Sequence, residues 1–380
     1  MRSRLNSLFD ALMPVFATLA ALAVGTVMLL ILRVNPGEAY GALWEGAFGS
    51  TNAVAETLVK ATPLLLVGLG ICIAFRASVI NIGGEGQMII GGILATQVGL
   101  TFTDLPGWVV IIMAMFAGFL GGAIWGGIPG FLKAYFRVNE ILSTVMMNAI
   151  AVQLMNFLLR GPMIDPAQAE KASKIPQTAR LLEAFRLPRL APTRLHIGFL
   201  IALGLAIIVY VLLWRTTLGY RIRAVGQNPH ASRYGGIRVR RRIVTALLLS
   251  GAFAGLAGAI QVYGVNYRMI TDGSASGFTG AAGFNGIVAA LFGQLHPIGT
   301  IPASIFFGAL LVGANKMQRV VQIPSALITA LNGLVVVFVV SSEFWRKQRQ
   351  RQRLSDNNKE ENPPQDGDIS APSAEEVLTS

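Results

Sequence analysis

The chain consists mainly of long apolar runs separated by short polar segments. A helix of about 20 apolar residues spans the hydrocarbon core of a bilayer, which is about 30 Å thick. Charged residues make up only 13% of the 380 residues, against roughly a quarter in soluble domains. The sequence therefore predicts an all-α polytopic membrane protein with about ten transmembrane helices. The expected spans are residues 14–32, 57–75, 86–102, 106–132, 141–159, 197–214, 243–263, 283–295, 298–314 and 326–341.

The first and eighth runs depart from an ordinary span. The run at 14–32 follows a basic N-terminus, but it is too long for the apolar region of a signal peptide and no A-x-A cleavage site follows it. We expect it to be retained as the first span. The run at 283–295 is too short to cross a bilayer alone, so it is either a partial span or the end of a helix that begins near Ser276.

Basic residues predict the orientation of the chain. The formal net charge is +12, and the most basic stretches are segment 215–242 and WRKQRQRQR near the C-terminus. Cytoplasmic loops are enriched in Lys and Arg, so the N- and C-termini are both expected in the cytoplasm. The segment 160–194 is also basic, although this assignment places it outside.

The same features divide the chain into three parts. Residues 1–13 form a cytoplasmic N-terminus, residues 14–345 form the transmembrane domain, and residues 346–380 form a cytoplasmic tail. The tail is basic as far as Arg353 and then polar and acidic, without an apolar period, so we expect it to be disordered. Its basic part is expected to lie against anionic membrane lipid.

The sequence contains no motif for nucleotide hydrolysis or other catalysis. A Walker A loop requires Gly-Lys, and no such pair occurs. Cys72 is the only cysteine, and His196, His230 and His296 lack the spacing of metal ligands. We therefore expect no enzyme activity, no cofactor and no nucleic-acid partner. Any ATP that drives the protein would be hydrolysed by a separate subunit.

Segment 215–242 contains a predicted surface helix. Asn228 is a favourable N-cap, Pro229 suits the first helical position, and Gly235 with Gly236 ends the segment. Two interpretations remain open, an ordinary basic loop or a docking helix for a cytoplasmic partner. The residues of interest in this segment are Arg223, Gly226, Asn228, Pro229, Ala231, Tyr234, Gly235, Gly236 and Ile237.

The stretch VINIGGEGQMIIGG, residues 79–92, combines glycines with a carboxylate inside apolar sequence. Gly83, Gly84 and Gly86 weaken a continuous helix, so we expect a broken or re-entrant helix that starts near Asn81. Asn81 or Glu85 can accept hydrogen bonds from the freed N–H groups. Three candidate roles for Glu85 remain open. They are accepting hydrogen bonds from exposed backbone N–H groups, contacting the substrate, and taking part in gating. Gln87 completes the polar set.

A weaker echo lies in the second half, where GFNGIVAALFGQLHPIG again places an amide, Asn285, among glycines. If the ten spans form two sets of five, the odd number makes the two five-helix halves inverted repeats. Transporters commonly bind substrate at broken helices in equivalent positions of such halves. Asn285 is therefore a second candidate for the substrate pathway.

Five segments occur in an order that resembles one family. They are NIGGEGQ at 81–87, NEILSTVMMNAIA at 139–151, RAVGQNPHASRYGGI at 223–237, LSGAFAGLAGA at 249–259 and GFNGIVAALFGQLHPIG at 283–299. The chain resembles the permease (transmembrane) subunit of a bacterial ABC importer of the simple-sugar/nucleoside type, related to ribose and branched-chain amino acid permeases.

The resemblance implies a set of partners and a mechanism. A second, paralogous permease subunit, ABC ATPase subunits and an extracytoplasmic substrate-binding lipoprotein would complete the importer in the bacterial inner membrane. Residues 223–237 would form the ATPase coupling loop, and the cargo would be a nucleoside or, alternatively, a simple sugar such as a pentose. The rival class is an ion-gradient-driven secondary transporter, in which Glu85 would be a proton or cation site.

Overall fold

The computed structural model describes residues 19–324 except 172, 173 and 191, together with residues 330, 333, 334, 337, 338 and 341. The predicted segment 1–13 and the predicted tail 346–380 lie outside the described residues, as does most of the expected span 326–341.

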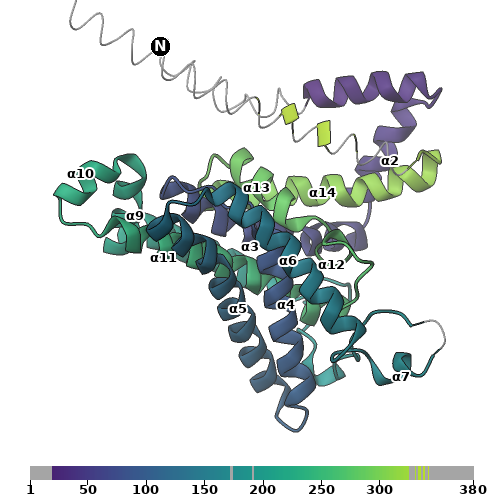
Figure 1. Ribbon diagram of the computed structural model, residues 1–380. Helices are drawn as coiled ribbons and strands as arrows, with labels where there is room; N and C mark the ends of the chain where they lie inside the picture. The colour runs from purple at the N-terminus through teal and green to yellow at the C-terminus, as the bar shows by residue number, and fades with distance from the viewer. Residues whose placement is uncertain are drawn as a thin grey trace, which may run out of the picture.

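Helices form the whole architecture of the described part, which contains no β-strand beyond two isolated bridges (Figure 1). A first, unlabelled helix spans Leu19–Ile31. The remaining elements are α2 (Pro36–Phe48), α3 (Thr51–Arg76), α4 (Gly84–Thr101), α5 (Gly107–Phe136), α6 (Glu140–Arg160), α7 (Pro166–Ala169), η1 (Glu183–Phe185), α8 (Gly198–Arg215), α9 (Thr217–Gln227), α10 (Pro229–Tyr234), α11 (Val239–Gln261), η2 (Val262–Asn266), α12 (Ser276–Thr279), α13 (Ala282–Phe292) and α14 (Pro297–Val321).

Within the described residues, six helices are long and apolar enough to cross a membrane. They are α3, α5, α6, α8, α11 continued by η2, and α14. The prediction of an all-helical membrane protein is thus confirmed. The total of ten spans, the inverted halves and the cytoplasmic termini stay predictions.

The structure adds one helix and decides between two alternatives. The 13-residue helix α2 follows an Asn35 cap and was not predicted. The run at 283–295 does not extend back to Ser276 as one helix, because Gly280 and Ala281 both adopt left-handed backbone conformations between α12 and α13. This interruption leaves α13 as a short helix of 11 residues.

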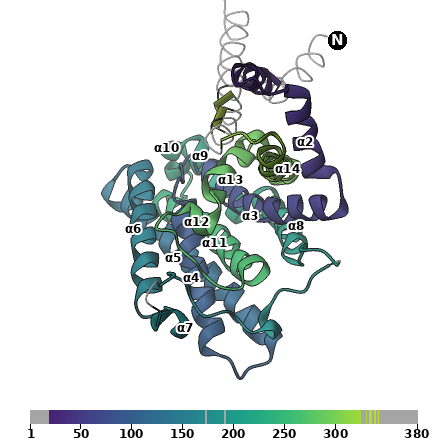
Figure 2. The same cartoon turned by 90° about the vertical axis from the view of Figure 1, so that its right-hand side faces the viewer.

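Helix α11 lies at the centre of the bundle and packs against α3, α4 and α5 (Figures 1 and 2). Glycine makes its contact with α5 close. A Cβ atom built on Gly122 would lie 2.2 Å from the Gly251 carbonyl oxygen, and one built on Gly255 would lie 2.2 Å from that of Gly118. Both pairs, Gly118 with Gly122 and Gly251 with Gly255, have the four-residue spacing by which membrane helices bring their backbones together.

The short helices α10 and α7 lie at opposite ends of the molecule (Figure 1). Helix α6 begins beside the end of α5, where Lys133 forms an ion pair with Glu140. It runs toward the end that carries α7 (Figure 1). The two ends of α6 therefore face different sides of the bundle.

Candidate functional site

The glycine-rich stretch is a break between two helices. Helix α3 ends at Arg76, a non-helical link covers residues 77–83, and α4 begins at Gly84 and continues to Thr101. The break agrees with the prediction, and the helix starts three residues after Asn81. Residues 84–93 are all buried, as are Asn81 and Gly83 of the link, whereas Ser78 and Ile80 are exposed. The end of the break at α4 therefore lies inside the bundle.

Asn81 and Gln87 form a reciprocal amide pair across this break. The Asn81 Nδ2 atom donates to Gln87 Oε1 at 3.0 Å, and Gln87 Nε2 donates to Asn81 Oδ1 at 3.1 Å. Asn81 also donates to Ser250 Oγ of α11 at 2.8 Å and accepts from the Gly83 N–H at 2.9 Å. Asn81 therefore acts as the predicted acceptor, and it also ties the link to the central helix.

The first turn of α4 is satisfied by a neighbouring helix. Asn148 of α6 accepts from the Gly86 N–H at 2.8 Å and donates to the Ile82 carbonyl at 2.9 Å. Because one side chain bonds both a carbonyl of the link and an N–H group of the first turn of α4, it fixes their relative position. Sequence reasoning missed this residue, although it lies in the quoted segment at 139–151.

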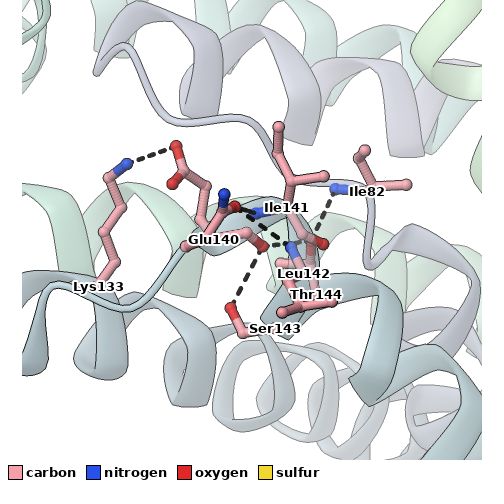
Figure 3. A network of polar contacts seen from close by, with 8 residues as sticks. Ile82, Lys133, Glu140, Ile141, Leu142, Ser143 and Thr144 are labelled. Atoms are coloured by element: carbon pink, nitrogen blue, oxygen red, sulfur yellow. Dashed lines mark hydrogen bonds and ion pairs between the residues drawn. The ribbon is translucent and has the colours of Figure 1, made fainter.

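The start of α6 is itself capped close to the same link. Asn139 Oδ1 accepts from the Ile141 and Leu142 N–H groups at 2.9 and 3.3 Å. Figure 3 shows the hydroxyl of Thr144, which accepts from the Ile82 N–H at 3.4 Å and donates to the Glu140 carbonyl. The link 77–83 is therefore held by side chains of both α6 and α11.

Glu85 connects α4 to α13 and does not cap its own helix, which corrects one of the two predicted acceptors. Its side chain is only 2% exposed, and Oε1 accepts from the Phe284 N–H in the first turn of α13 at 3.2 Å. A Cβ atom on Gly283 would lie 2.4 Å from the Glu85 backbone nitrogen. Absence of a side chain at Gly283 thus lets the starts of α4 and α13 touch.

Asn285 does not join this network. It lies one residue after Phe284 in α13, is half-buried and makes no side-chain hydrogen bond to another described residue. The two similar segments, 81–87 and 283–299, do contact each other in space. The contact is made by Gly283 and Phe284 and not by the Asn285 amide. In this conformation the side chains of Asn81, Glu85 and Gln87 are enclosed, and each makes at least one hydrogen bond that holds the segments together. The second carboxylate oxygen of Glu85, Oε2, is buried without a hydrogen-bond partner among the described residues.

The predicted surface helix is α10. Asn228 Oδ1 accepts from the Ala231 N–H at 3.0 Å, Pro229 occupies the first position, and the Gly235 N–H donates to Ala231 O at 2.9 Å. Gly236 has a φ of 76°, which favours glycine. The capped helix is confirmed in its position. Tyr234 is 94% exposed at its end.

Helix α9 joins this surface helix to the helix break. A Cβ atom on Gly226 would lie 2.1 Å from the Arg76 carbonyl oxygen, and Ser78 Oγ donates to the Gly226 carbonyl at 2.6 Å. The guanidinium groups of Arg76 and Arg223 lie 5.1 and 5.8 Å from the centre of the Trp214 ring. Helix α9 is therefore in direct contact with the residues that precede Asn81.

The chain matches known transport proteins along most of its length. The model of the family described as branched-chain amino acid transport system / permease component matches residues 53–340. The guanosine ABC transporter permease protein NupP of Bacillus subtilis is 38% identical over 331 residues, which cover 87% of this chain and 93% of the relative.

Two further relatives are similar over long segments. The glucose ABC transporter permease protein TsgB13 of Haloferax volcanii is 34% identical over 88% of each chain. The guanosine ABC transporter permease protein NupQ of Bacillus subtilis is 31% identical over 67% of this chain and 79% of its own. No solved structure matches the chain.

Proposed function

The chain belongs to the family of branched-chain amino acid transport system permease components, and on that premise we propose that it is the nucleoside-conducting permease subunit of an ATP-driven importer. It is a multi-pass protein of the bacterial cytoplasmic membrane. The observation that carries the proposal is the capped, exposed helix α10, which α9 connects to the helix break inside the bundle.

The proposed cargo is a nucleoside. Two of the relatives, NupP and NupQ, are named as guanosine permeases. A sugar is the second candidate, because another relative of similar coverage is named as a glucose permease. A nucleoside differs from a sugar by its planar base, which aromatic side chains can stack against.

ATP hydrolysis is assigned to a separate subunit that docks on segment 215–242. Tyr234 and Arg233 are exposed at the end of α10, and an exposed aromatic with an arginine is typical of a protein interface. Closure of the ATPases would push α10 and α9 against Arg76 and Ser78. This push would move the link 77–83 and with it the start of α4. The permease itself needs no cofactor in this scheme.

A second permease and an extracytoplasmic lipoprotein complete the proposed importer. NupP and NupQ are two guanosine permeases of one organism, which supports a pair of paralogous permeases. With α10 in the cytoplasm, both termini lie there as well, and α7 lies on the outer side. The proposed arrangement has two inverted five-helix halves, which the contact of α4 with α13 would join.

Uptake by the complete complex tests the proposal. Vesicles that contain this permease, its partner permease and the ATPase, supplied with the binding protein, should accumulate radiolabelled guanosine when ATP is enclosed. Excess unlabelled nucleoside should compete, whereas glucose and ribose should not. Competition by a sugar alone would replace the nucleoside proposal with the sugar proposal.

The secondary-transport alternative has a separate test. A proton gradient without ATP should give no guanosine uptake in the same vesicles. Uptake driven by that gradient alone would overturn the ATP-driven scheme and would make Glu85 the proton site to examine.

A further inference from the structure

The outward faces of the two neighbouring helices α5 and α6 differ in polarity. The exposed residues of α5 form an apolar stripe of Trp108, Ile112, Phe116, Leu120, Ile124, Ile128, Phe131, Tyr135 and Phe136. This spacing and composition are those of a helix face in lipid.

Helix α6 begins with a similar face but does not keep it. Its exposed residues are apolar from Ile141 to Ile150 and then include Gln153, Phe157 and Arg160. Gln153 lies about 20 Å along the axis from Glu140, since a helix rises about 1.5 Å per residue. An amide at that depth is costly against lipid, so this part of α6 faces a polar environment.

An open depression lies on this part of the helix. It has a volume of about 580 Å³, and its lining residues Gln153, Asn156, Phe157, Arg160 and Gly161 all belong to α6 and its C-cap. A space of this size is large enough for a small organic ligand to lie against the helix. We call these five residues the α6 pocket.

The side chains of the α6 pocket differ in how many hydrogen bonds they already make with the protein. Asn156 is oriented by two contacts, because it accepts from Thr271 Oγ1 at 2.7 Å and donates to the Gly273 carbonyl at 3.3 Å. One of its N–H groups remains free of these two bonds. Gln153 and Arg160 make no side-chain hydrogen bond to another described residue, and the Phe157 ring is 67% exposed.

We propose that the α6 pocket binds the base of the transported nucleoside, with Phe157 stacked on its face and Gln153, Asn156 and Arg160 at its edge. This inference rests on the proposed function and names the cargo site for it. Aromatic stacking recognises any base. The donors of Arg160 match the adjacent O6 and N7 acceptors of a 6-oxopurine, so guanosine and inosine are the expected cargo.

The place of the pocket agrees with such a role. It lies at the end of α6 that is remote from α10 (Figure 1), which the proposed orientation puts on the side of cargo delivery. The polar residues of the helix break are enclosed in the present conformation, and Asn81 and Gln87 are bound to each other, so they are not open to cargo. In this proposal, residues 153–161 of α6 contact the cargo, whereas Thr144 and Asn148 of the same helix stabilise the break.

Thiol labelling of the assembled importer tests the location. The only native cysteine, Cys72, is fully buried, so a Gln153→Cys variant carries one reactive thiol. A membrane-impermeant maleimide should label it, and guanosine should slow the labelling several-fold. The matched variant Phe116→Cys, on the apolar stripe of α5, should stay unlabelled. Absence of labelling at position 153, or labelling that guanosine leaves unchanged, would overturn the proposal.

Transport kinetics test the contact independently of thiol chemistry. Phe157→Leu keeps an apolar side chain but removes the ring, and it should raise the KM for guanosine by about 10-fold, as expected for loss of one stacked base. Phe116→Leu, which changes a phenylalanine that is 61% exposed on α5, should leave the KM unchanged. Equal KM values for both variants and the unaltered importer would contradict the assignment.

Arg160→Met tests the choice of base. It should raise the KM for guanosine more than the KM for adenosine, because only guanosine offers the O6 acceptor. An equal rise for both nucleosides would remove Arg160 from base recognition. If the unaltered complex imports no nucleoside at all, the proposed function fails, whereas import that is indifferent to these substitutions overturns only the α6 pocket.

Discussion

The helix break at 77–83 and the segment α9–α10 each lie between two long helices, but the polar groups around them differ in their partners. At the break, Asn81, Gln87 and Asn148 are bonded to one another or to backbone within the bundle. At α10, the side chains of Arg233 and Tyr234 are exposed. The difference indicates a joint whose polar groups are bonded within this chain, and a surface that is left open for another protein.

The two regions also differ in what a substitution should do. An unpaired buried polar group costs about 1–3 kcal/mol, so changes at the break should lower the stability of the permease itself. An exposed N-cap contributes about 0.5–2 kcal/mol to a local helix, so changes at α10 should spare the fold and affect coupling. The following predictions run from the largest expected effect to the smallest.

Gly283→Ala should be the most disruptive of these changes. Its Cβ atom would lie 2.4 Å from the Glu85 nitrogen and 2.8 Å from Glu85 Cδ, and overpacking of this kind costs about 1–3 kcal/mol or more. The melting temperature of the purified permease should fall clearly. Gly204→Ala is the control, because no neighbouring atom lies within 4 Å of its added Cβ. Equal melting temperatures for the two variants would show that α4 and α13 do not meet closely.

Asn148→Ala should destabilise the break by about 1–3 kcal/mol, because it leaves the Gly86 N–H and the Ile82 carbonyl without their partner. Thermal unfolding of the purified permease measures the effect. Asn315→Ala, which removes an exposed amide from α14, should have almost none. If the Asn148→Ala permease melts at the same temperature as the unaltered protein, Asn148 of α6 does not stabilise the break.

Asn228→Ala combined with Gly236→Val should uncouple ATP hydrolysis from uptake and leave the melting temperature unchanged. The first change removes the cap of α10, worth about 1 kcal/mol, and the second places a branched side chain at a φ of 76°. Guanosine uptake per ATP hydrolysed in the complete complex measures coupling.

Gly235→Ala is the matched control for that variant. Gly235 has a φ of −74°, and a Cβ atom there would meet its nearest neighbours at 3.6 Å, so alanine fits. The structure thus separates two adjacent glycines that look equivalent in the sequence. Normal coupling in the Asn228→Ala, Gly236→Val variant would contradict a docking role for α10.

Ser78→Ala should have the smallest effect. It removes one exposed hydrogen bond, to the Gly226 carbonyl, worth about 0.5–1.5 kcal/mol. Uptake per ATP should fall modestly because α9 then holds the link less firmly. Thr245→Val is the control, since its exposed hydroxyl bonds only within α11. A larger loss of coupling in the control would point away from Ser78 as the connection.

Much of this architecture could be predicted because it depends on local chemistry. Apolar length predicted the long helices, and the order Asn228, Pro229, Gly235 and Gly236 predicted α10 with its caps. The glycine cluster likewise predicted the break near Asn81. Each of these features depends on residues close together in the chain.

The partners across the break could not be predicted in the same way. Ser250 and Asn148 meet Asn81 and Gly86 only after α11 and α6 have packed. Glu85 was expected near its own helix start, yet it bonds with Phe284, 199 residues further along the chain. The α6 pocket was not predicted from the sequence. Gln153 and Arg160 stand out only when the outward face of α6 is compared with the apolar outward face of α5.

Amide hydrogen exchange tests the contrast between the two regions most directly. Peptides from residues 84–93 should be strongly protected in the isolated permease and unchanged in the complete importer, because their bonds lie within this chain. Peptides from residues 229–237 should exchange quickly in the isolated permease and slow at least several-fold when the ATPase subunits bind. Equal exchange of residues 229–237 with and without the ATPase would contradict the account.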